Sequence, residues 1–362
     1  MELLIGIVAG LIILVILVVM HEFGHAMQAH RSGVVVEEFG IGFPPRALAK
    51  KLKNGILFTI NWLPIGGFVK LKGEYDSASE KGDYGAATFW QKTKILLAGV
   101  FINWIFAAIL LTVLAITGLP KVLSNQFAIS GDTTTVSQPV EISSIVRDYP
   151  ASKSGLQIGD QVISLNGQVI SGVDQLIGLI KENANKDIEL IYLRDKKEYT
   201  ISVALGDSTS NGTLGAGLGQ RELTKATWSA PIVGVVTTAQ LTLETIKGVG
   251  GIFVGIVSGG LNKVGDNVAG PIGILGTVFP AAARAGLTQL TFLAAIISIS
   301  LAVMNILPIP SLDGGRWFTM AIFRLFKKKL TKEREEKIQA VGIMILMALI
   351  ILVTFNDITK LF

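Results

Sequence analysis

Eighteen uncharged residues, from Leu3 to Met20, lead directly into the segment His21-Glu22-x-x-His25. A helix of about 20 apolar residues is long enough to cross the hydrocarbon core of a membrane. In such a helix His21 and His25 lie one turn apart on one face, where both imidazoles can bind a single Zn²⁺ with Glu22 beside them as general base. The sequence therefore predicts a metal site at the end of a membrane-spanning helix.

Composition limits what else could complete this metal site. Half of the 362 residues are hydrophobic and 16% are charged, a balance that disfavours a plain soluble globule. Cysteine is absent, so a zinc ion can be held only by histidine and carboxylate. The remaining histidine, His30, follows His25 at i+5 and we expect it on the surface. A further ligand must therefore come from a distant part of the chain.

Charge distribution predicts the topology. Eight Lys or Arg lie in residues 31–91 and eight more in 309–337, and the positive-inside tendency places both loops in the cytoplasm. Residues 226–262 contain Glu244 and Lys247, so we expect an amphipathic or surface-lying helix there, with a fifth span as the alternative. The first apolar run lacks a basic n-region and a cleavage site, so we expect it in the mature protein.

The predicted organisation follows from these runs and loops. It comprises a first span with the His pair over 1–30, a cytoplasmic loop with a membrane-associated β-hairpin over 31–91, a second span over 92–120, an inserted α+β domain over 136–205, a linker and surface-helix region over 206–286, a third span over 287–315 and a fourth over 338–356.

The predicted hairpin consists of residues 55–63 and 65–71, two stretches rich in β-forming residues on either side of Pro64. Two interpretations remain open for it. It is either a small structural sheet or an exposed edge near the metal that pairs with an extended substrate. In the second case the pairing residues are Gly67, Phe68, Val69 and Lys70.

The inserted domain alternates strand-like and helical segments. A short helix opens at Pro150, a Gly-Leu-x-x-Gly-Asp turn covers 155–160, the tight-turn pair Asn166-Gly167 follows a strand, and an amphipathic helix lies near 173–182. This order looks like a PDZ domain of the circularly permuted bacterial kind. The flanking segments, 121–136 and 206–224, are rich in Ser, Thr, Gly and Asn and are predicted to be linkers.

The candidate for the distant ligand is Asp313, in the motif Asn-x-x-Pro-x-Pro-x-Leu-Asp-Gly-Gly that starts at Asn305. Prolines end the third span just before this carboxylate, so Asp313 and His25 would lie at the same cytoplasmic depth. The alternative is that Asp313 caps the next helix. Ionisable groups at the end of a span are costly unless they are paired or bound to metal, which favours the metal site.

With both motifs in place, the chain resembles the site-2 protease family of intramembrane zinc metalloproteases, in its RseP-like branch with one PDZ domain. The Gly-Phe-Val-Lys-Leu strand, the PDZ insertion and the Gly270-Pro271-Ile272-Gly273 stretch also belong to the resemblance. One departure is Val100, where relatives often have Pro after the Gly, and it affects only the local geometry of the second span. The resemblance implies zinc bound by His21, His25 and Asp313, Glu22 as catalytic base, and Asn305 in substrate handling.

The fold implied is a polytopic α-helical membrane protein with about four transmembrane helices, a cytoplasmic-side β-hairpin and an extracytoplasmic PDZ domain. The implied activity is a zinc metalloendopeptidase that cuts within or near transmembrane segments, with the active site near the cytoplasmic side of a bacterial inner or plasma membrane. Expected partners are pre-cleaved single-span substrates, such as anti-sigma factors or signal-peptide remnants, a peptide or protein ligand of the PDZ domain, and the lipid bilayer. No nucleic acid is expected.

Two other functions are alternatives to the protease. The first is a catalytically inactive, membrane-tethered PDZ adaptor, and the intact set His21, Glu22, His25 and Asp313 argues against it. The second is a transporter, and four spans without repeated halves argue against it.

Overall fold

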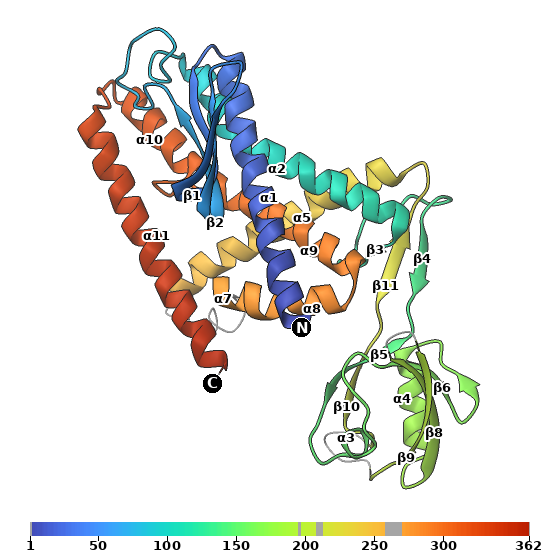
Figure 1. Cartoon of the computed structure of the whole chain (residues 1–362). Coiled ribbons are helices and arrows are strands. Elements are labelled where there is room, and N and C mark those ends of the chain that lie inside the picture. Colours follow the sequence, from blue (N-terminus) through green and yellow to red (C-terminus); the bar gives the residue numbers. More distant parts are fainter. Residues whose placement is uncertain (1, 195–196, 208–212, 258–269, 362) are drawn as a thin grey trace. The chain divides into compact units, whose positions relative to one another are not determined.

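The computed structural model describes residues 2–194, 197–207, 213–257 and 270–361 (Figure 1). The chain divides into two compact units, Met1–Leu114 with Ala230–Phe362, and Ala115–Ser229. The parts of the predicted 206–286 region that fall on 208–212 and 258–269 lie outside the described residues.

Within the described residues of the first unit, four helices are long and apolar enough to cross a membrane. A helix satisfies its backbone hydrogen bonds internally, which is the condition for crossing hydrocarbon. The predicted fold class, a multi-pass α-helical membrane protein with about four spans, is confirmed. The four helices are α1 (Glu2–Arg31), α2 (Phe89–Thr117), α9 (Leu287–Ile306) and α11 (Lys332–Leu361).

The described part of this unit also contains other helices. A Cβ atom added at Gly234 of α5 would lie 2.2 Å from Thr112 Oγ1 of α2, so the glycine permits close packing of the two helices. Further along, Trp104 Nε1 donates a hydrogen bond to Thr242 Oγ1 over 3.1 Å. The predicted surface-lying helix is thus packed against α2. These helices are α5 (Ala230–Val257), α7 (Pro271–Gly273), the π-helix η1 (Ile274–Val278), α8 (Phe279–Arg284) and α10 (Asp313–Leu325).

The sheet of the first unit corrects the predicted hairpin. Strand β2 (Leu57–Leu71) runs through Pro64, and its antiparallel partner is β1 (Val36–Lys51). Both strands bend, so that Phe39 of β1 is in register with Phe58 and also with Val69. Residues 57–61 consequently lie between two segments of β1, whereas 67–71 lie at an edge of the sheet. Glycines and prolines in β1 weaken its β propensity, which is why the sequence did not predict it.

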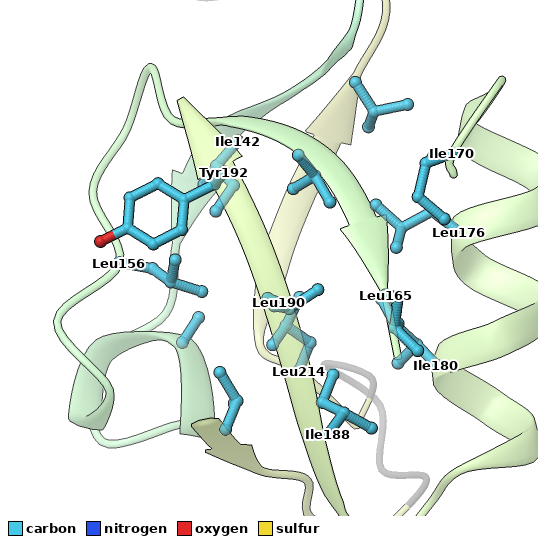
Figure 2. Close-up of a cluster of buried hydrophobic side chains, with 14 of the residues drawn as sticks. Ile142, Leu156, Leu165, Ile170, Leu176, Ile180, Ile188, Leu190, Tyr192 and Leu214 are labelled. Atoms are coloured by element: carbon cyan, nitrogen blue, oxygen red, sulfur yellow. The ribbon is translucent and has the colours of Figure 1, made fainter. Parts of the chain in front are cut away.

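The second unit contains an α+β domain with its own apolar core (Figure 2). The amphipathic helix α4 turns Leu176 and Ile180, one turn apart, toward sheet residues such as Leu165 and Leu190. The sheet order is β10-β5-β6-β8-β9, with β7 paired to β6. The elements are β5 (Val140–Ile145), α3 (Pro150–Lys153), β6 (Gln161–Leu165), β7 (Gln168–Val169), α4 (Val173–Glu182), β8 (Asp187–Arg194), β9 (Lys197–Ala204) and β10 (Ala216–Gly219).

Two predicted boundaries of this domain need correction. Strand β10 lies beyond the predicted end at 205, and it belongs to the sheet because Leu218 pairs with Ile142 of β5. Parts of the segments predicted as linkers belong to a second sheet, in the order β3-β11-β4. Gly and Asn depress β propensity in these segments, so cross-strand pairing rather than local preference forms the strands. They are β3 (Leu119–Pro120), β4 (Thr134–Ser137) and β11 (Glu222–Lys225).

Candidate metal centre

The two predicted ligand motifs meet in the first unit. His21 and His25 lie in the C-terminal half of α1, and Asp313 is the first residue of α10. The cap position of α10 is Leu312, in an extended conformation, so Asp313 does not serve as the N-cap. Its carboxylate instead contacts both histidines, 292 and 288 residues earlier in the chain.

Gly314 and Gly315 make the turn before Asp313 possible. A Cβ atom added at Gly314 would lie 2.1 Å from the carbonyl oxygen of Ile306, and one at Gly315 would lie 1.9 Å from that of Ile309. Any larger residue would therefore push α10 away from the end of α9. The glycine pair keeps the Asp313 carboxylate beside the histidines.

The three ligand atoms form a nearly equilateral triangle. His21 Nε2 lies 3.0 Å from Asp313 Oδ2 and 3.1 Å from His25 Nε2, and His25 Nε2 lies 3.3 Å from Asp313 Oδ2. Ligand atoms at 2.0–2.1 Å from a tetrahedral zinc ion are about 3.3 Å apart. The triangle therefore has the size that one such ion requires, and it leaves one tetrahedral position open.

Hydrogen bonding also favours a shared cation at this triangle. His25 Nδ1 lies 2.8 Å from the carbonyl oxygen of Ile95, to which it must donate its proton, so the Nε2 of the neutral ring presents a lone pair. A neutral His21 can donate only one proton into the triangle. His25 Nε2 and Asp313 Oδ2 therefore face each other as two acceptors, which a cation between them would satisfy.

Helix α2 forms a cradle behind the histidines. A Cβ atom added at Gly99 would lie 2.5 Å from His25 Nε2 and 2.7 Å from His21 Cε1. One at Gly24 of α1 would lie 2.6 Å from the carbonyl oxygen of Ala98. No motif in the sequence marks Gly99 as part of the site. Its one sequence signal is a glycine inside a span, which is typical of close helix packing.

A cavity of about 440 Å³ lies at the three ligand side chains and includes most of the other predicted site residues. Glu22 lines it, and the backbone N–H of Val69 faces the Glu22 carboxylate. Phe68 from β2 and Asn305 from α9 line the same cavity.

Two predicted substrate residues and His30 lie differently. A Cβ atom added at Gly67 would be 3.8 Å from Glu22 Cγ, so the strand passes close to the carboxylate at this point. Lys70 does not line the cavity, because its ammonium pairs with Glu37 over 2.9 Å and its side chain is 60% exposed. His30 is exposed, as expected.

The sequence did not predict a charged cluster beside the cavity, centred on Arg316. Its guanidinium donates to Glu335 Oε1 over 3.2 Å and to Glu74 Oε1 over 3.3 Å, and lies 4.6 Å from the centre of the Tyr84 ring. Arg316 follows Asp313 at i+3, so both lie on one face of α10. The cluster joins the metal-bearing turn to the loop after β2 and to the start of α11.

Residues 9–349 match the sequence model of peptidase family M50. A Clostridium perfringens protein provisionally named a zinc metalloprotease is 31% identical over 351 residues, which cover 94% of this chain and 95% of that protein. Regulator of sigma-W protease RasP of Bacillus subtilis is 26% identical over 441 residues, covering 98% of this chain and 99% of that protein. Among solved structures, the PDZ domain of an SdrC-like protein from Listeria monocytogenes is 20% identical and covers 25% of this chain and 93% of that chain, with a TM-score of 0.21.

The membrane-long helices and the His-His-Asp triangle define a membrane metallopeptidase. The chain belongs to peptidase family M50, since the family match extends over most of its length. The resemblance to the site-2 protease family and the prediction of an enzyme are thereby confirmed.

Proposed function

We propose that this chain is a zinc endopeptidase that hydrolyses peptide bonds within or near the transmembrane segments of other membrane proteins. The observation that carries the proposal is the triangle of His21, His25 and Asp313, with zinc-compatible spacing, on a helix long enough to cross a membrane. Two imidazoles and a carboxylate are a donor set typical of catalytic zinc. The zinc metalloprotease names of several relatives support the same cofactor.

Zinc held by these three side chains supplies a Lewis acid that polarises the scissile carbonyl and lowers the pKa of water. Glu22 is the proposed catalytic base, which takes the proton of the attacking water and delivers it to the leaving amine. The Val69 N–H faces the Glu22 carboxylate, and its proposed role is to orient this group toward the cavity. Asn305 is placed to hold a peptide group of the substrate.

The edge of β2 is the proposed binding site for the unwound substrate. The Lys72 N–H donates to the Val35 carbonyl over 2.9 Å, so by the alternation of a strand the even-numbered amides of this segment face β1. The Val69 N–H faces Glu22 instead, and Gly67 has the same parity. An extended peptide paired along this edge would replace the helical hydrogen bonds lost on unwinding and would pass the metal centre.

The proposed topology places the metal centre near the cytoplasmic side of a bacterial plasma membrane. The positive-inside tendency supports it, since both basic loops then lie in the cytoplasm and the inserted domain lies outside. We propose that this external domain is a PDZ domain that admits single-span substrates already shortened by an earlier cut. Anti-sigma factors and signal-peptide remnants are substrates of this kind.

The proposal is tested with the purified full chain, a tagged single-span substrate in detergent, and metal analysis. We expect about one zinc per chain, loss of cleavage on chelation, and recovery when zinc is restored. Asp313→Ala should lose zinc and cleavage together while the helical content stays native. A chain that binds the substrate without cutting it, at full zinc content, would instead be the membrane-tethered adaptor.

A further inference from the structure

Asn103 of α2 is a buried amide for which the described part of the chain offers no partner. The residue is 0% exposed, and neither its side-chain nitrogen nor its side-chain oxygen has a hydrogen bond there. Buried polar groups are nearly always hydrogen-bonded, because an unpaired one costs free energy. Asn103 is therefore suited to a partner that the chain itself does not supply.

Asn103 is one of the residues that line the cavity of the metal centre. Asn103 follows Gly99 at i+4, so it lies on the face of α2 that packs against His21 and His25. The backbone carbonyl of Asn103 accepts a hydrogen bond from Ser298 Oγ over 2.8 Å, which fixes α2 against α9 at this level. Its side chain is thereby held at the cavity wall by a contact that does not use the amide.

The second asparagine of the cavity differs in its bonding. Asn305 Nδ2 donates to the Leu301 carbonyl of its own helix over 2.9 Å, so half of that amide is already engaged. Asn103 keeps both a donor and an acceptor available, which is the complement of one peptide group.

We propose that Asn103 is a substrate-binding residue that pairs with a backbone peptide group of the unwound substrate. The inference rests on the proposed function and deepens it. A transmembrane segment opened for cleavage exposes N–H and C=O groups that hydrocarbon cannot satisfy. The edge of β2 pairs with the backbone groups on one side of an extended segment, and the amide of Asn103 satisfies a peptide group that this edge does not reach.

The decisive variant is Asn103→Leu, which keeps the approximate shape and removes the polar atoms. Cleavage of the tagged single-span substrate should show KM raised about tenfold, with kcat changed less, because one or two hydrogen bonds to substrate are lost. Affinity for a fluorescent form of the substrate, measured in the Glu22→Gln background, should fall by the same factor. Zinc content should stay native, and the thermal midpoint should stay equal or rise, since an unpaired buried amide has been removed.

Thr237→Val of α5 is the matched control, because it also removes a buried polar group that has no hydrogen bond within the described residues, and Thr237 does not line the cavity. It should leave KM and substrate affinity unchanged. Asn103→Ala serves as a second variant if leucine does not fit. A lower thermal midpoint with native KM in both variants would make Asn103 a structural residue, and native KM with native stability would mean that its partner is only water. Either result overturns the inference and leaves the proposed function standing, whereas a native chain that does not cleave would remove both.

Discussion

Gly99 sets how closely α2 can approach the metal ligands. Its missing side chain leaves room for His25 Nε2 and the His21 ring at distances where a methyl group would overlap both. The Ile95 carbonyl, one turn earlier on the same helix, orients the His25 ring. The metal centre therefore depends on a helix that contributes no ligand.

We predict that Gly99→Ala lowers zinc affinity about 10–100-fold, the loss typical of changes to groups that orient metal ligands. The added methyl group must displace His25 or separate α1 from α2. Competition against a chelator of known affinity measures the change. Gly248→Ala is the control, because a Cβ atom there meets nothing within 4 Å, and equal zinc affinity in both variants would contradict the prediction.

The sequence identifies the metal-binding side chains, but it does not identify the groups that hold these side chains in position. The i, i+4 spacing places His21 and His25 on one face of any helix, and the proline-rich motif brings Asp313 to the end of a span. The supporting groups, namely Gly99, the Ile95 carbonyl and Asn103, depend on how α2 packs against α1. No local pattern in the sequence specifies that packing.

The edge of β2 is the element that links the sheet to the metal centre. Its Val69 N–H contacts Glu22, and its outer edge is the proposed binding site for substrate. We predict that Val69→Pro, which removes this N–H, lowers cleavage at least about tenfold while zinc content stays native. Val69→Ala keeps the N–H and should retain activity. Unchanged cleavage in the proline variant would count against a role for this edge.

Loss of cleavage in Val69→Pro has two possible origins, the orientation of Glu22 and the pairing of substrate. Substrate affinity in the Glu22→Gln background separates them, because no proton transfer is needed for binding. Strand pairing predicts weaker binding on adding Val69→Pro. Unchanged binding would restrict the role of Val69 to Glu22.

Helix α11 is tied to the unit at both ends by polar contacts. Glu335 accepts from Arg316 near its start, and the Asp357 carboxylate accepts from the N–H groups of Gly270 and Gly273 over 2.9 and 2.8 Å. A Cβ atom added at Gly270 would lie 2.6 Å from Asp357 Oδ2. The backbone N–H groups of the Gly-Pro-Ile-Gly stretch therefore bind this carboxylate.

We predict that Asp357→Ala destabilises the first unit by about 2–3 kcal/mol, because two hydrogen bonds to a charged group are lost. The thermal midpoint of the purified alanine variant in detergent should be lower than that of the native chain. Asp357→Asn keeps one acceptor, so its thermal midpoint should be lowered less. A native midpoint in the alanine variant would show that these contacts do not hold α11.

Among the secondary-structure elements, the structure contains the four predicted spanning helices, whereas its strands differ from the predicted ones. Long apolar runs can only be helices in a membrane, so the four spans follow from composition. The positions of the strands in the sheet do not follow from composition, because β1 contains glycines and prolines and because β2 continues past Pro64. Strands β10 and β11 form through pairing with distant partners, which low local β propensity concealed.

In the second unit, the inserted α+β domain has a separate core, and the chain segments before and after it pair in the β3-β11-β4 sheet. A deletion that replaces residues 139–220 with a short Gly-Ser linker keeps all three strands of this sheet. We predict that the shortened chain keeps its zinc and cleaves substrates with intact external domains that the native chain rejects. If it instead loses cleavage of a pre-shortened substrate, the domain presents substrates and does not exclude them.

In the proposed mechanism, His21, His25 and Asp313 hold zinc while Glu22 performs proton transfer. Glu22→Gln separates the two roles, since an amide cannot take up the proton and residue 22 is not among the three ligands. The measurement is zinc content and cleavage of the tagged single-span substrate on the same purified sample. We predict native zinc content with cleavage reduced to background. Cleavage that survives the substitution at native zinc content would contradict the role of Glu22 as catalytic base.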